Sequence, residues 1–80
     1  MMVAKFTVYD VVTQGEPKQS EVLKLRPVTA KPFDAEGISE DNSFAKWTPS
    51  GNLEMTVSNP ALFDRIKVGD NFRLTFDKCE

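Results

Sequence analysis

Histidine is absent from this chain of 80 residues, and cysteine occurs once, at Cys79. Without histidine, the chain lacks the side chain that most often transfers protons near neutral pH and the commonest zinc ligand. A single cysteine cannot form a disulfide within the chain, which fits a reducing compartment, and it does not make a metal–thiolate site. The serines have no histidine to activate them, and no glycine-rich phosphate loop is present. We therefore expect a protein that is not an enzyme and that holds neither a metal nor a cofactor.

Long apolar runs are also missing from the sequence. No stretch approaches the 18 apolar residues expected of a helix that spans a membrane. The first ten residues, MMVAKFTVYD, do not combine a basic segment with a long apolar run, as a signal peptide does. We therefore expect a cytoplasmic protein without a membrane partner.

Basic residues do not outnumber acidic ones, and the formal net charge is -2. Proteins that bind DNA or RNA generally are usually clearly basic, so we do not expect general DNA binding. A small phosphorylated ligand is compatible with this charge, because such a ligand needs only one local basic cluster.

Eighty residues suffice for one small β domain, which we place at residues 1–80. A chain of this length buries only about 60% of its unfolded surface, so the core is thin. Strand edges in so small a domain need cover, and we therefore expect a homo-oligomer.

Apolar and polar residues alternate over segments 3–12, 20–28 and 71–76, which is the period of half-buried strands. The first of these segments is expected to place Ala4, Phe6 and Val8 on one face and Lys5, Thr7 and Tyr9 on the other, with Val11 continuing the second set. The sequence also predicts a polar turn over 13–18 and an acidic surface loop over 29–41. Asn59-Pro60 is a helix-start signal, and it predicts a short helix over 60–66.

The stretch Asn42–Val57, NSFAKWTPSGNLEMTV, predicts a hairpin. Thr48-Pro49-Ser50-Gly51 is expected to form its turn, with a positive φ at the glycine, and alternation resumes from Leu53. Together the segments predict a mainly β fold: a small antiparallel barrel or curled sheet of about five strands with one short helix.

An aromatic residue beside cations makes this hairpin a candidate ligand site. Trp47 can stack on a nucleobase and Lys46 can pair with a phosphate, while Arg26 or Lys24 on the neighbouring strand can supply a second cation. The candidate ligand-binding residues are Trp47, Lys46, Thr48, Ser50, Arg26 and Lys24, and Phe44 and Arg73 belong to the same aromatic and cationic set. Other roles stay open: Phe44 and Trp47 as packing residues, Lys46 as a solvated lysine, and the turn hydroxyls as caps of their own backbone.

The sequence from about residue 22 to residue 77 resembles a widespread family of small phage-encoded proteins. The similarity lies in the motif S-F-x-K-x-T-P-x-G, read here as Ser43 to Gly51, in Asn59-Pro60, and in Gly69 to Phe76 at the end. This chain departs from the family pattern in the acidic stretch, which is Ser39-Glu40-Asp41-Asn42 here, at Asp70, where lysine is usual, and at Phe72 and Leu74 in the closing strand.

The resemblance implies a viral sponge protein that sequesters cyclic dinucleotide signals of CBASS anti-phage defence, without catalysis and in the host-cell cytoplasm. Two other functions are compatible with the sequence. One is a structural or regulatory phage protein that binds another protein, and the other is a small barrel that binds single-stranded nucleic acid.

Overall fold

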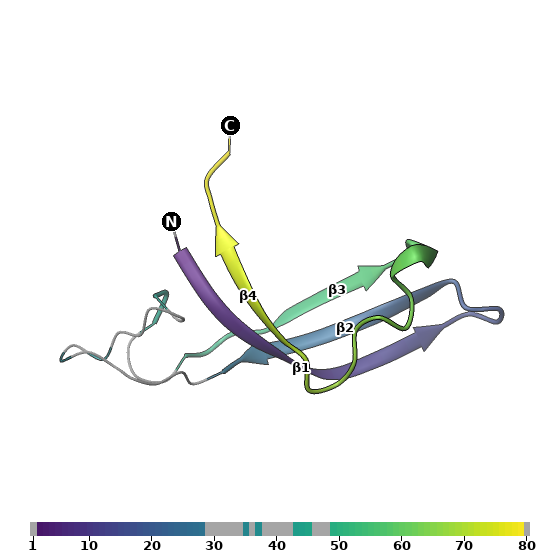
Figure 1. The fold of residues 1–80 in the computed structure, drawn as a ribbon, viewed down its shortest axis with the longest axis horizontal. Coiled ribbons are helices and arrows are strands. Elements are labelled where there is room, and N and C mark those ends of the chain that lie inside the picture. Colours follow the sequence, from purple (N-terminus) through teal and green to yellow (C-terminus); the bar gives the residue numbers. More distant parts are fainter. Residues whose placement is uncertain (1, 29–34, 36, 38–42, 46–48, 80) are drawn as a thin grey trace.

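The described part of the chain folds as a curled antiparallel sheet of four strands with almost no helix (Figure 1). The structure is a computed structural model, and it describes residues 2–28, 35, 37, 43–45 and 49–79. The elements are β1 (Met2–Gln14), β2 (Ser20–Pro27), β3 (Leu53–Val57), the 3-10 turn η1 (Pro60–Leu62) and β4 (Asn71–Phe76). The strands are ordered β3-β2-β1-β4, so the predicted fold class is confirmed. No described helix is long and apolar enough to cross a membrane.

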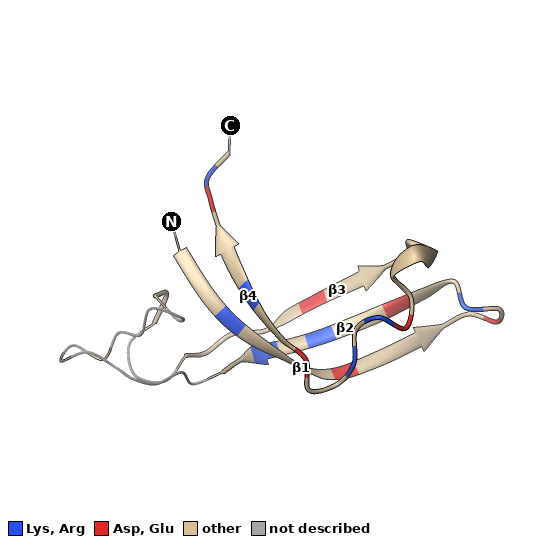
Figure 2. Ribbon diagram, viewed as in Figure 1, with Lys and Arg blue, Asp and Glu red and all other residues tan. Residues whose placement is uncertain are grey.

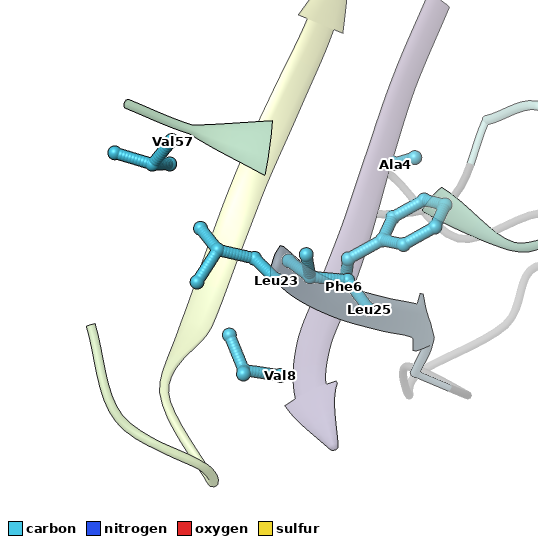
Figure 3. Close-up of a cluster of buried hydrophobic side chains, with 6 residues drawn as sticks. All are labelled: Ala4, Phe6, Val8, Leu23, Leu25 and Val57. Atoms are coloured by element: carbon cyan, nitrogen blue, oxygen red, sulfur yellow. The ribbon is translucent and has the colours of Figure 1, made fainter. Parts of the chain in front are cut away.

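One face of the sheet, here called the core face, carries the buried side chains. They are Ala4, Phe6, Val8, Leu23, Leu25 and Val57, drawn in Figure 3. Phe63 and Ile66, which follow η1, pack against this cluster, as does Phe44, whose predicted packing role is thereby confirmed. Burial of a large apolar side chain contributes about 1.5–3 kcal/mol, so this cluster contributes substantially to the stability of the described sheet.

A β-bulge at Tyr9 corrects the predicted faces of β1. Val8 lies opposite Leu25, but the next paired residue, Asp10, lies opposite Lys24, so β1 contains one extra residue. After the bulge, Val11 lies opposite Leu23 and packs against the core. The prediction that Val11 shares a face with Lys5 and Thr7 was therefore wrong, because an extra residue reverses the alternation that follows it.

In the described residues, the structure differs from the hairpin predicted at 42–57. Ser43–Ala45 form a turn rather than a strand, and the Ser43 N–H donates to the Val3 carbonyl at 2.9 Å. β3 forms as expected, but its partner is β2. Residues 49–52 lead into β3 without a turn, and Gly51 is not among the glycines with positive φ. Because β3 is positioned by its pairing with β2, the local turn that the Thr-Pro-Ser-Gly sequence favours is not required to place it.

The predicted helix over 60–66 is shortened to η1. Asn59 caps it as expected, because its Oδ1 accepts a hydrogen bond from the Ala61 N–H at 3.1 Å. Phe63 is already extended, and Asp64 has a left-handed φ of 63°. The Asp64 N–H donates to the Glu21 carboxylate at 3.2 Å, and this contact with β2 replaces a further helical turn. Of the predicted loop over 29–41, only residues 35 and 37 are described, so that prediction lies outside the described residues.

Candidate ligand-binding surface

Cations gather on the face of the sheet opposite the core, here called the outer face. Lys24 and Arg26 lie on it, because they alternate along β2 with the buried Leu23 and Leu25. Lys5 on β1 and Arg73 on β4 lie directly opposite each other on the same face. Figure 2 shows basic positions on β1, β2 and β4, whereas the charged position on β3 is acidic. Lys24 and Arg26 therefore share the outer face, as the alternation over 20–28 implies.

Arg26 and Tyr9 form the most organised part of this face. The guanidinium carbon of Arg26 lies 5.5 Å from the centre of the Tyr9 ring, a cation–π contact. The Tyr9 hydroxyl donates to Asn52 Oδ1 at 3.4 Å, which links the pair to the segment that precedes β3. Tyr9 remains 40% exposed, so the ring is held in place while much of it still faces solvent.

The same segment brings Ser50 to this end of β2. A Cβ added to Gly51 would lie 3.6 Å from the Pro27 ring, so the backbone at residue 51 passes close to the end of the strand. Ser50 is exposed and lies two residues before Asn52. The Arg26 end of β2 thus has an aromatic ring, a guanidinium group and polar side chains from a neighbouring segment close together.

Lys24 lies in a different environment from Arg26. It is in register with Asp10 on β1 and with Glu54 on β3, so a carboxylate side chain flanks it on each side. A shallow depression of about 250 Å³ adjoins Lys24 and Glu54. Within the described residues, neither Lys24 nor Arg26 forms an ion pair within 4.0 Å. Of the two, Arg26 is better suited to an anion, because nearby carboxylates repel a phosphate from Lys24.

Lys46, Trp47 and Thr48, half of the predicted site, lie outside the described residues. Their placement beside Arg26 or Lys24 stays a prediction. The segments on either side both lie beside the sheet: Ser43 forms hydrogen bonds with Val3, and Gly51 lies close to Pro27.

Sequence reasoning missed Tyr9 and Asn52 as parts of this surface. Alternation placed Tyr9 on the correct face, but nothing local indicated that the bulge would set its ring beside Arg26. Asn52 follows a predicted turn, and only the pairing of β3 with β2 brings it near Tyr9.

A second charged cluster, at the turn between β1 and β2, has a structural role. Lys18 Nζ lies 3.0 Å from Glu21 Oε2 and 2.7 Å from Asp64 Oδ1, and 5.4 Å from the centre of the Phe63 ring. The hydrogen bond from Lys18 lowers the pKa of the Asp64 carboxyl below its ordinary value, and the bonds to Asp64 and Glu21 raise the pKa of Lys18. All its polar groups are paired with one another, so the cluster fastens the η1 segment to the sheet and offers no site for a ligand.

The outer face can bind an anion and stack a flat ring, and the described residues contain no group of side chains that could hold a metal ion. No protein-family model matches the chain, and no curated protein or solved structure matches it either.

Proposed function

We propose that the protein binds and sequesters a small phosphorylated nucleotide, of the cyclic dinucleotide class, on the outer face around Arg26. The observation that carries this proposal is the Arg26–Tyr9 pair, an exposed cation held over an aromatic ring without a carboxylate partner among the described residues.

The two groups match the two parts of a nucleotide. A guanidinium group presents several donors in a planar fork and binds phosphate oxygens through charge-assisted hydrogen bonds. A base stacked on an aromatic ring gains about 1–3 kcal/mol, whatever its identity. Asn52 and Ser50 add polar groups that can contact the edge of a base or the sugar. In the proposal, Trp47, Lys46 and Thr48 complete the site with a second stacking surface and a second cation.

Two features favour a nucleotide signal over other anions. The first is the resemblance to a family of small phage-encoded proteins, which includes the segment from Ser43 to Gly51 and implies a sponge for a cyclic dinucleotide. The second is the absence of histidine, which favours binding without chemical conversion. Sequestration in the host-cell cytoplasm needs only affinity and a sufficient amount of the protein.

The test is a thermal-shift screen of cyclic dinucleotides and a single-stranded DNA oligonucleotide, followed by calorimetry on variants. A ligand that binds only the native state raises the melting temperature. Loss of one charge-assisted contact in Arg26→Gln should weaken binding roughly 10- to 100-fold and flatten its salt dependence. Trp47→Ala should weaken binding with little change in salt dependence.

Lys67→Gln is the matched control, because it removes the same charge from an exposed position outside the sheet. It should bind as the parent does. The proposal fails if no cyclic dinucleotide shifts the melting temperature, or if Arg26→Gln binds as tightly as Lys67→Gln. A shift with the oligonucleotide alone would favour a protein that binds single-stranded nucleic acid.

A further inference from the structure

β4 forms one edge of the sheet, and no described strand pairs with its outer side. On the core face at this edge, Phe72, Phe76 and the neighbouring Met2 remain 37%, 48% and 42% exposed. A depression of about 520 Å³ opens here, lined by Met2, Phe76, Asp77 and Lys78. Proteins usually protect an edge strand with charge, proline or a covering segment, whereas no described strand covers this edge, and aromatic side chains remain exposed beside it.

We propose that β4 pairs antiparallel with β4 of a second copy of the chain, with Thr75 on the two-fold axis. In this register, Leu74 lies opposite Phe76 of the partner subunit on the core face. Phe72 lies opposite Lys78 of the partner subunit, an aromatic–cation pair. On the outer face, Arg73 lies opposite Asp77 of the partner subunit. The two-fold axis repeats each of these contacts.

The sequence of the strand favours this register over its neighbours. A shift by one residue would place the core face of one copy beside the outer face of the other. A shift by two residues, with Leu74 on the axis, would keep the faces aligned but place Arg73 opposite Thr75 and separate it from Asp77. Only the register with Thr75 on the axis gives every charged residue from 73 to 78 an attractive cross-strand partner.

The extended sheet also pairs residues that lie beyond the part of β4 that is paired with β1. Met2 is the first residue of β1, and it lies opposite Phe76, so Asp77 and Lys78 continue past the paired end of β4. Pairing with a second copy gives them strand neighbours and covers part of the apolar side of the depression. The inference is independent of the nucleotide proposal, because it depends on the edge of β4 and not on Arg26 or Tyr9.

Charge reversal tests the register directly. Light scattering at micromolar concentration should give twice the mass of the chain. Arg73→Asp or Asp77→Arg alone should yield the single-chain mass, because each places two like-charge pairs in the interface. The double variant should recover the doubled mass. Glu54→Arg on β3, the opposite edge, makes the same change in charge as Asp77→Arg and should leave the mass doubled.

Disulfide trapping provides a second measurement. With Cys79 replaced by serine, Thr75→Cys should cross-link two chains under mild oxidation, because the residue faces its own copy across the axis. Thr56→Cys, exposed on β3, should not cross-link under the same conditions. A monomeric parent would overturn the proposal. Dimers that survive both single reversals, or that do not trap through residue 75, would overturn it as well.

Discussion

Replacing Glu21 with alanine should lower the free energy of unfolding by about 2 kcal/mol, because this buried carboxylate joins two separate parts of the chain. Glu21 is only 3% exposed, although it carries a charge. Its Oε2 accepts hydrogen bonds from Lys18 Nζ at 3.0 Å and from the Asp64 N–H at 3.2 Å. Truncation removes the acceptor of both donors.

The magnitude follows from what each donor retains. Lys18 keeps its contact with Asp64 Oδ1, and its side chain is 23% exposed, so water replaces part of what it loses. The hydrogen bond from the Asp64 N–H is partly buried, so water replaces it only in part, and an unsatisfied buried donor costs about 1–3 kcal/mol. In a domain of this size a loss of about 2 kcal/mol lowers the melting temperature by roughly 8–16 °C.

Urea unfolding followed by far-ultraviolet circular dichroism measures the change. Glu21→Gln keeps an acceptor for the Asp64 N–H but loses the charge, so it should lose about half as much stability as Glu21→Ala. Glu54→Ala, an exposed carboxylate on β3, should stay within about 0.5 kcal/mol of the parent. A Glu21→Ala protein as stable as Glu54→Ala would refute the reasoning, because the cluster would then contribute nothing to folding.

Two further predictions concern the Lys18 cluster and the bulge. The pKa of Asp64 is lowered from its ordinary 3.8 and that of Lys18 is raised from 10.5, so the contribution of their pair should be fully present between these values. This contribution should be lost as the pH falls through the lowered pKa of Asp64 or rises through the raised pKa of Lys18. Asp64→Asn should remove the contribution of the pair, and with it both of these pH dependences, as measured by urea unfolding across pH. Val11→Asp should cost about 1–3 kcal/mol more than Val12→Asp in the same assay, because Val11 packs against the core while Val12 is 37% exposed. Equal losses would contradict the bulge.

The strands that could be predicted are those whose faces depend only on local alternation. Ala4, Phe6 and Val8, like Leu23 and Leu25, carry the period of a half-buried strand in their own sequence, and the structure buries them all. The bulge at Tyr9 could not be predicted in this way. It depends on the pairing of β1 with β2, and Tyr9 itself is compatible with either continuation of the strand.

The error at 42–57 has a similar cause. The Thr-Pro-Ser-Gly sequence is a genuine turn signal, but the energy of a turn is small compared with that of a paired strand. Leu53 and Val57 pair with β2, and the Ser43 N–H bonds to Val3, so both ends of the segment are fixed by residues distant in the sequence. In the candidate site, too, some features follow from local alternation and others depend on strand pairing. The shared face of Lys24 and Arg26 followed from alternation, whereas the partnership of Arg26 with Tyr9 required the bulge.

The net charge of -2 is compatible with an anion site because the charge is unevenly distributed along the sequence. Residues 29–41 contain four carboxylates and one lysine, which leaves nine basic and eight acidic residues in the rest of the chain. Charges beyond about 8–10 Å are largely screened at physiological ionic strength, so a ligand at Arg26 responds to its immediate neighbours. There the contrast between Arg26 and Lys24 matters more than the total, since Asp10 and Glu54 flank only Lys24. For the proposed function, we therefore expect electrostatic selection of a phosphate at the Arg26 end of β2, where Tyr9 also offers a ring for stacking.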